Sequence, residues 1–433
     1  MTSRSTSSPS PSPRGTAGTG HSARTAAPRA DRLWSVNFRL YFTARTVAML
    51  GDTMLPVALS AGLLSYGYSA TDIGLVMAAS TACFAGLVIF GGVFADRFNA
   101  RAMMIGADLV RVASQSTAAV LFFTHHVRLW EVVVIAVVNG TAAAMFQPGV
   151  SSTVPRVAAD VQGANGVTRT AESVAALTGP AVAGLLVGFA SPGAVFAVHA
   201  STYLTSALCL IGLRLAPLPP RRAGAPAAGA RGFTADLAEG WREFRARTWM
   251  WSVIVVWMVY MICVVGPFTP LAASLIIPAH GAGAYGLVNS ALGAGTAVGA
   301  LCAMRIRAEH PLRAGTLALF VVGLLPASVG LDLPVPGMMG CVFVAGAGSA
   351  YWGVNWATSV QTQVPGDILN RIHAYEVAGS IAMTPVGQAL AGPAASVFGA
   401  REVLRTGAVA AVGIAVTLLA IPAVRNLRRA RAT

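Results

Sequence analysis

The chain has 433 residues, of which 55% are hydrophobic and only 11% are charged, and its formal net charge is +14. Soluble domains carry roughly 25% charged residues, which argues against a single water-soluble core. The apolar runs are about 20 residues long, as a bilayer-spanning helix requires, whereas barrel strands would be about 10 residues long with polar alternation. The composition therefore predicts an all-α integral membrane protein.

Residues 1–33 precede the first apolar run and are rich in Ser, Pro, Arg and Ala. Such a segment cannot bury enough apolar surface to fold, so we expect a disordered cytoplasmic tail. A transit peptide, which is also rich in Arg and Ser and poor in acidic residues, is the alternative. The tail is favoured because the segment has no clear amphipathic stripe.

About twelve apolar runs follow the tail. The expected spans are residues 38–64, 70–95, 101–124, 129–151, 163–189, 193–215, 249–275, 281–304, 314–331, 336–360, 371–398 and 402–423. The longest loop divides them into two halves. The expected domains are an N-terminal bundle at 34–216, a cytoplasmic linker at 217–247, a C-terminal bundle at 248–426 and a cytoplasmic tail at 427–433.

The two halves are weakly similar to each other. LTGPAVAGLLVG at 177–188 ends the fifth span, and AMTPVGQALAG at 382–392 occupies the corresponding place in the eleventh. Parallel six-helix repeats are a known transporter architecture, so we expect two pseudo-repeated six-helix bundles.

Arginines are concentrated on one side of the expected membrane. That side includes both tails and the 217–247 linker, whereas the loops on the other side contain only Arg128, Arg401 and Arg405. Basic loops stay in the cytoplasm. We therefore expect a multi-pass protein of the bacterial inner or plasma membrane with both termini cytoplasmic, and the positive charge does not indicate nucleic-acid binding.

Motifs of enzymes and metal sites are missing from the sequence. The five cysteines lie inside apolar runs without C-x-x-C spacing and are interpreted as packing residues. There is no Walker A, HExxH or GxSxG motif. We expect no enzyme activity, no metal and no cofactor, with a proton gradient as the energy source.

The segment GGVFADRFNARAMM at 91–104 places charges in a short break between two apolar runs. Its pattern G-x-x-x-D-R-x-x-x-R, at Gly92, Asp96, Arg97 and Arg101, resembles the signature loop of the major facilitator superfamily. Asn99 stands where the family often has Gly, and Asn also tolerates a left-handed backbone. The resemblance spans about residues 36–424. It implies the major facilitator fold with 12 transmembrane helices and transport of a small molecule by a monomer, through alternating access.

Asp96 is the candidate for a conformational latch. It lies at an expected helix end, where a carboxylate can accept from a neighbouring helix N-terminus and pair with an arginine. Our candidate partner is Arg371, at the start of the eleventh span in the other half. Such a latch would hold the halves together in the outward-facing state. The alternative is that these residues are ordinary loop charges that set topology.

Gly179, Pro180 and Gly184 in the fifth span resemble the family's antiporter motif G-P-x-x-G-G, with Ala183 in place of one glycine. Gly and Pro permit a bend and close packing in a membrane helix. This resemblance implies proton-driven export, and generic small-residue packing is the alternative. Residues 43–59 and 164–184 also resemble the bacterial macrolide and siderophore exporters.

Several ionisable residues fall inside the expected spans, where a charge costs about 2.5–3.5 kcal/mol and so indicates a function or a partner. The proton-coupling candidates are Asp52, Asp108, Arg111, Glu172 and Glu376. Asp108 and Arg111 are three residues apart, as are Arg169 and Glu172, so each pair shares a helix face and could be purely structural.

Asp52 is the leading candidate, because it lies near the middle of the first span, which the resemblance implies lines the cavity. A carboxyl group in a low-dielectric cavity takes up a proton more readily than in water. We expect Asp52 to carry the proton or to contact a cationic substrate, with Arg111 modulating it. The alternative is a packing residue bonded to Arg45, Arg111 or Asn139.

Substrate contacts are expected in the C-terminal half. The cavity candidates are Trp257, Tyr260, Asn289, Trp352, Asn355 and Trp356. Aromatic residues with few charges suit a bulky, partly apolar molecule. Helix packing or an interfacial aromatic belt is the alternative.

The sequence thus favours a proton-coupled antiporter that exports a small amphipathic molecule, such as an antibiotic, a drug or a siderophore. The alternatives are a metabolite importer of the same fold and a non-transporting membrane receptor or scaffold.

Overall fold

The computed structural model describes residues 34–97, 99–158, 160–214, 242, 245–306, 308–364 and 382–429, and this part of the chain is helical without strands. The N-terminal half contains α1 (Val36–Ser65), α2 (Ala70–Arg97), α3 (Ala100–Phe123), α4 (Leu129–Val157), α5 (Val161–Phe189) and α6 (Pro192–Gly212). The C-terminal half contains α8 (Thr248–Tyr260), η2 (Met261–Val265), α9 (Gly266–Arg305), α10 (Pro311–Leu319), η3 (Phe320–Gly323), α11 (Leu324–Gly330), α12 (Val335–Gln363), α14 (Thr384–Phe398), α15 (Ala400–Ala420) and α16 (Pro422–Arg425).

The predicted all-α membrane architecture is confirmed. Nine segments of the described chain are long and apolar enough to cross a membrane. One of them, Thr248–Arg305, reverses at Gly281, where φ is +83°. Glycine adopts this backbone conformation without steric penalty. This segment therefore supplies two of the expected spans, 249–275 and 281–304.

Two further expected spans are helical but are not among those nine. Helix α3 is less apolar because Asp108, Arg111 and Gln115 lie in its middle. Helix α14 is described only from Thr384 onward, so much of the expected span 371–398 lies outside the described residues. The expected tail at 1–33 and residues 217–241 of the expected linker also lie outside them.

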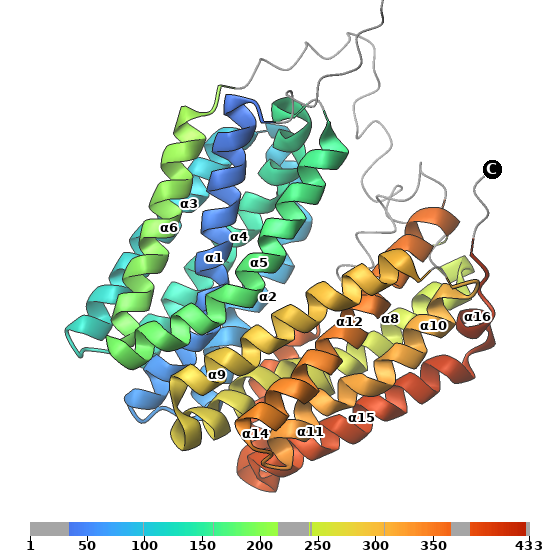
Figure 1. The fold of residues 1–433 in the computed structure, drawn as a ribbon. Helices are drawn as coiled ribbons and strands as arrows, with labels where there is room; N and C mark the ends of the chain where they lie inside the picture. Colours follow the sequence, from blue (N-terminus) through green and yellow to red (C-terminus); the bar gives the residue numbers. More distant parts are fainter. Residues whose placement is uncertain are drawn as a thin grey trace, which may run out of the picture.

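The helices form two bundles that meet at one end and diverge toward the other (Figure 1). The diverging end carries the start of α1, the end of α6 and the start of α8. Contacts between the bundles involve α5 with α9, and α2 with α14. These two helix pairs occupy equivalent places in the two halves, as the weak internal repeat suggested.

Small residues allow the bundles to approach closely at their meeting end. A Cβ atom added to Gly74 of α2 would lie 2.3 Å from the carbonyl oxygen of Gln388 in α14. Likewise, a Cβ atom on Gly392 of α14 would lie 2.1 Å from the Thr71 hydroxyl oxygen. Backbone-to-backbone contact of this kind is typical of helix association in membranes.

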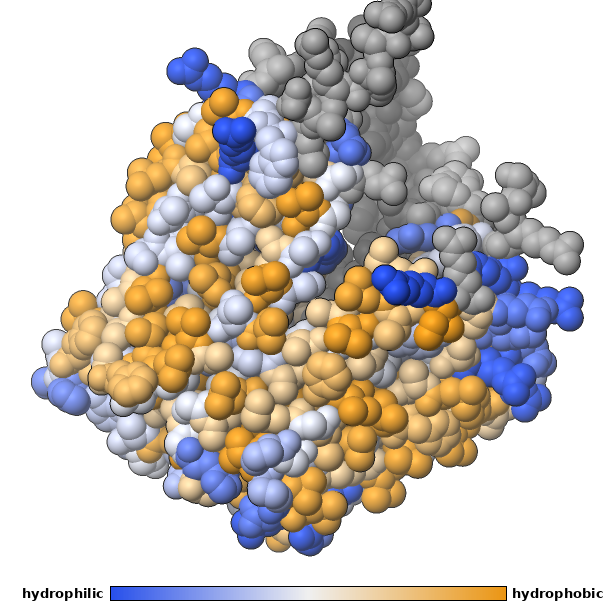
Figure 2. Space-filling model, in the orientation of Figure 1, coloured by the Kyte–Doolittle hydropathy of each residue, from blue (hydrophilic) through white to orange (hydrophobic). Residues whose placement is uncertain are grey.

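The outer faces of both bundles are largely apolar, and hydrophilic residues gather toward the ends of the helices (Figure 2). Exposed side chains on these faces include Leu208, Leu301 and Val409. An exposed apolar surface of this extent requires a hydrocarbon solvent.

Candidate functional site

Asp52 lies in the middle of α1 and faces α6. The Tyr203 hydroxyl donates a hydrogen bond to Asp52 Oδ1, and His199 Nε2 lies 3.5 Å from the same oxygen. The Asp52 side chain is 37% exposed. Helix α6 comes this close because residue 51 is glycine, where an added Cβ would lie 2.4 Å from His199 Cδ2. Asp52 is thus hydrogen-bonded by Tyr203 with His199 beside it, whereas the packing alternative named Arg45, Arg111 or Asn139 as its partner.

Asp108 and Arg111 are buried on the face of α3 that packs against α6. Arg111 Nη1 lies 3.9 Å from Asp108 Oδ1, and the Ser206 hydroxyl donates to Asp108 Oδ2 at 2.6 Å. The Arg111 guanidinium group also stacks on the ring of Tyr203, 4.9 Å from its centroid. Because Tyr203 contacts both Asp52 and Arg111, one aromatic side chain links the ionised groups of α1 and α3.

These groups border a polar cavity of about 320 Å³ inside the N-terminal bundle. Arg45, Asp52 and Arg111 supply its charges. Other residues of its wall are Ser80, Thr81, Phe84, Asn139, Phe146, Gln147 and Tyr203. A charged cavity inside a membrane bundle is the kind of site that binds ions or polar groups of a substrate.

A second, apolar cavity of about 220 Å³ adjoins the first one and shares Ser80, Thr81 and Asn139 with it. Its walls include Leu55, Leu59, Leu121, Phe122, Val132, Ile135 and Phe196. Thr269 of α9 and Gln388 of α14 line it from the other bundle. The second cavity therefore exists because the bundles are closed against each other at this end.

Three amide side chains introduce polarity into the apolar cavity. The side-chain oxygens of Gln115, Asn139 and Gln388 are buried without a hydrogen-bond partner among the described residues. Buried polar groups of this kind are usually satisfied, so these amides are available to hydrogen-bond with a guest molecule. Of the three, only Asn139 was named from the sequence, as a possible partner of Asp52; Gln115 and Gln388 carry no charge, so nothing in the sequence marked them.

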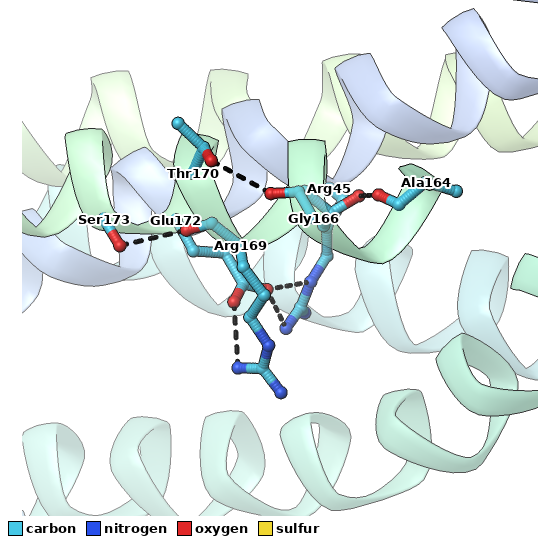
Figure 3. Close-up of polar contacts among 8 residues, drawn as sticks. Arg45, Ala164, Gly166, Arg169, Thr170, Glu172 and Ser173 are labelled. Carbon is cyan, nitrogen blue, oxygen red and sulfur yellow. Dashed lines mark hydrogen bonds and ion pairs between the residues drawn. The ribbon is translucent and has the colours of Figure 1, made fainter. Parts of the chain in front are cut away.

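Glu172 on α5 pairs with two arginines (Figure 3). Arg45 Nη2 of α1 lies 2.9 Å from Glu172 Oε1, and Arg169 Nη1 lies 3.2 Å from Glu172 Oε2. Arg45 and Glu172 are mostly buried, at 15% and 12% exposure, whereas Arg169 is 84% exposed. The Arg45–Glu172 pair thus joins α1 to α5, and Arg169 adds a surface contact within α5.

This difference in burial predicts unequal effects on stability. Arg45→Met is expected to lower the free energy of unfolding by about 1.5–3 kcal/mol, because it removes a buried charge-assisted hydrogen bond. Arg169→Met is expected to change it by less than about 1 kcal/mol, because exposed ion pairs contribute little. Thermal unfolding of both variants in the same detergent measures the difference. Equal losses would show that burial of the pair is irrelevant.

Gly179, Pro180 and Gly184 lie on α5 where this helix contacts α1 and α9. A Cβ atom on Gly179 would lie 2.0 Å from the Thr53 hydroxyl oxygen of α1, whereas one on Gly184 would lie 2.7 Å from the Ala282 carbonyl oxygen of α9. At the contact between α5 and α9, the Ala181 backbone N–H also donates to the Ser290 hydroxyl at 3.0 Å. The segment thus belongs to the contact of α5 with α9, which forms the seam between the two bundles.

The aromatic candidates of the C-terminal half form one cluster. Trp257 stacks on Trp352 at 5.7 Å and lies 4.6 Å from Tyr260, and Trp352 stacks on Trp356 at 6.2 Å between centroids. Trp352 and Tyr260 are buried, while a small pocket between α8 and α12 reaches Trp257 and Trp356. The cluster is therefore in large part packing within this bundle.

The hydrogen bonds described for Asn289 and Asn355 stay within their own helices. Each donates to a carbonyl oxygen one turn earlier in its own helix, of Tyr285 and Tyr351 respectively, at 2.8 Å.

The proposed latch is described only in part. Gly92, Asp96 and Arg97 belong to the last turns of α2, and their side chains lie outside the described part of the chain, as do Arg371 and Glu376. Arg101 donates to the carbonyl oxygens of Leu210, at 2.8 Å, and Ile211. Arg101 therefore caps the C-terminal end of α6, where a cation is favourable.

Several characterised and uncharacterised transporters are similar to this chain. An uncharacterized MFS-type transporter of Bacillus subtilis, YvqJ, is 22% identical over 90% of this chain and 93% of its own length. The multidrug efflux pump Tap of Mycobacterium tuberculosis is 24% identical over 90% of this chain and 94% of its own length. Macrolide efflux protein A of Streptococcus pyogenes is 22% identical over 53% of this chain and 56% of its own length.

Solved structures share the fold at low identity. A mutant of the nucleoside transporter NupG has a TM-score of 0.72 at 12% identity, covering 89% of this chain and 99% of that one. A bacterial homologue of the human lysosomal transporter Spinster, in an inward-facing and unoccupied conformation, has a TM-score of 0.68 at 16% identity, covering 91% and 96%.

Two helical bundles that meet at one end and diverge at the other, with buried charges and cavities between their helices, are the architecture of a membrane transporter. The sequence matches the Major Facilitator Superfamily over residues 41–383, and the chain belongs to that family. It is therefore a multi-pass membrane transporter of small molecules rather than an enzyme.

Proposed function

We propose that this transporter exports a small amphipathic molecule from the bacterial cytoplasm in exchange for protons. The observation that carries the proposal is the arrangement of the two cavities. Asp52 borders the polar cavity, which adjoins an apolar cavity lined by Phe122 and Phe196. A molecule with one polar or cationic end and one apolar body matches this pair of cavities. Relatives named as macrolide and multidrug efflux proteins support export.

The direction of opening is consistent with export. If both termini are cytoplasmic, as the arginine distribution predicts, the diverging end of the bundles faces the cytoplasm. Substrate then enters from the cytoplasm or the inner leaflet and stops at Thr269 and Gln388, which close the apolar cavity. When the bundles part at this closed end, both residues leave the cavity wall and the substrate is released outside.

Proton exchange follows from Asp52, the one carboxylate among the described residues that line the polar cavity. Asp52 can bind either a proton or the polar end of a substrate, because one ionised group cannot serve both at once. Protonation from outside would favour release of the substrate, and release of that proton into the cytoplasm would restore the binding site. The latch between Asp96 and Arg371, proposed from the family resemblance, would close the cytoplasmic end during the outward-facing step.

Accumulation of amphipathic antibiotics and dyes in cells that express the protein tests this function. We expect at least one compound to accumulate less than in cells without the protein, and a protonophore to abolish the difference. Greater accumulation in expressing cells would instead indicate an importer. No change across the panel, with confirmed expression, would contradict export of amphipathic molecules.

A further inference from the structure

His199 lies beside Asp52 in the N-terminal bundle and was not singled out by the sequence. Its side chain is 1% exposed, and its Nε2 atom lies 3.5 Å from Asp52 Oδ1. Neither ring nitrogen has a hydrogen-bond partner among the described residues. A buried imidazole without such partners is unfavourable unless the site serves a purpose, because a buried polar group loses its hydrogen bonds to water.

The surroundings leave Asp52 as the acidic partner of this imidazole. Helix α1 packs its Gly51 against the ring, and on α6 Tyr203 lies 4.5 Å away between ring centroids and donates to Asp52. Other charged groups on the helices that pack against α6 have partners of their own. On α3, Arg101 caps the end of α6, Asp108 is held by Ser206 and Arg111 is stacked on Tyr203. On α5, Glu172 pairs with Arg169 and with Arg45 of α1.

Access to the cavity distinguishes the two residues. Asp52 borders the polar cavity, whereas His199 is enclosed by α1 and its own helix. A proton from the cavity therefore reaches His199 through Asp52. Nε2 lies 3.5 Å from Oδ1, so an approach of about 0.6–0.8 Å forms a charge-assisted hydrogen bond of ordinary length, about 2.7–2.9 Å.

We propose that Asp52 and His199 together form the proton-binding site, with Asp52 as the entry group and His199 Nε2 as the group that holds the proton. This inference rests on the proposed proton coupling. The Asp52 carboxyl O–H bond breaks, an N–H bond forms at Nε2, and the products are a carboxylate and an imidazolium. Transfer in the opposite direction returns the proton to the cavity. Imidazole suits this role because it is the side chain that ordinarily titrates near neutral pH.

The pair also explains how a proton and a substrate can exclude each other. With the proton on His199, the imidazolium and the Asp52 carboxylate neutralise each other. A cationic substrate end at Asp52 would then place a second positive charge next to the imidazolium. Like charges at this distance repel, so arrival of the substrate drives the proton back to the cavity.

Nitrogen-15 NMR of histidine-labelled full-length protein in detergent tests the pair without any substrate. The His199 resonance is identified by its loss in His199→Gln, and His126→Gln, which replaces an exposed loop histidine, is the matched control. We expect this resonance to report protonation of His199 as the pH is lowered. The protonated fraction at a given pH should be lower in Asp52→Asn, because the neighbouring carboxylate that stabilises the imidazolium is removed.

Two results would overturn the proposal: a His199 resonance that does not titrate, or one that titrates identically in Asp52→Asn. Should His199→Gln fail to fold, a protein that keeps His199 as its sole histidine supplies the same resonance. The outcome is independent of the proposed function. If the His199 titration depends on Asp52 but the protonophore does not change accumulation, the proton site stands and proton-driven export is refuted. If the protonophore abolishes export but the His199 titration does not depend on Asp52, only the Asp52–His199 pair is refuted.

Discussion

Replacing Asp52 with asparagine is expected to leave a folded protein that cannot concentrate its substrate outside the cell. Asparagine keeps the shape of the side chain and can accept from Tyr203, but it cannot bind and release a proton. Moving one elementary charge across 100 mV supplies about 2.3 kcal/mol. Loss of one coupled proton therefore lowers the attainable ratio of outside to inside compound concentration about fifty-fold at that potential. The steady-state ratio of exported compound at a fixed membrane potential measures this loss.

The matched control for this variant is Asp332→Asn. Asp332 lies on the loop between α11 and α12, is 57% exposed and pairs with Arg401 at the surface. It undergoes the same chemical change far from the cavities, so its transport should equal that of the wild type. An Asp52→Asn protein that maintains the wild-type gradient with unchanged pH dependence would show that Asp52 is not the proton carrier.

Gly286→Ala is expected to shift the protein away from the conformation described here. A Cβ atom at Gly286 of α9 would lie 2.4 Å from the Pro180 carbonyl oxygen of α5, across the seam that closes the bundles. Overpacking of this kind costs about 1–3 kcal/mol. This cost lowers the population of the conformation closed at this end, relative to the open one, by about 5- to 150-fold. The variant should therefore favour the state that is open at this end, and its transport should fall.

Gly283→Ala is the matched control, because a Cβ atom at Gly283 of the same helix has no neighbour within 4 Å. Spin labels on the loops 66–69 and 331–334, in a background without the five native cysteines, report the separation of the bundles at this end. We expect longer distances for Gly286→Ala and wild-type distances for Gly283→Ala. Identical distances and fluxes in both variants would show that this seam does not open during transport.

The fold could be predicted because apolar run length sets the helix length in a membrane. The expected span 70–95 corresponds to α2 (Ala70–Arg97), and 163–189 corresponds to α5 (Val161–Phe189). The π-helical turn η2 could not be predicted, because it depends on a neighbour from another part of the chain. The carbonyl oxygens of Met261 and Ile262 lie against Gly387 of α14 there, and the sequence shows only an uninterrupted apolar run.

The site could be predicted only where its contacts are local. Asp108 and Arg111 pair within one turn of α3, as their spacing indicated. Tyr203 is 151 residues away from Asp52 along the chain, so their hydrogen bond arises from the packing of α6 on α1. One local signal was available, since His199 and Tyr203 are four residues apart on one face of a predicted span, where a buried imidazole suggests a function.

Proton counter-transport can be measured most directly in inside-out membrane vesicles that hold a pH-sensitive dye and are acidified inside. Each compound that expressing cells exclude is added outside, at the cytoplasmic face. For the wild-type protein, entry of the compound should raise the internal pH, and for Asp52→Asn the internal pH should stay constant. Entry of the compound into wild-type vesicles without any rise in internal pH would contradict proton-coupled export.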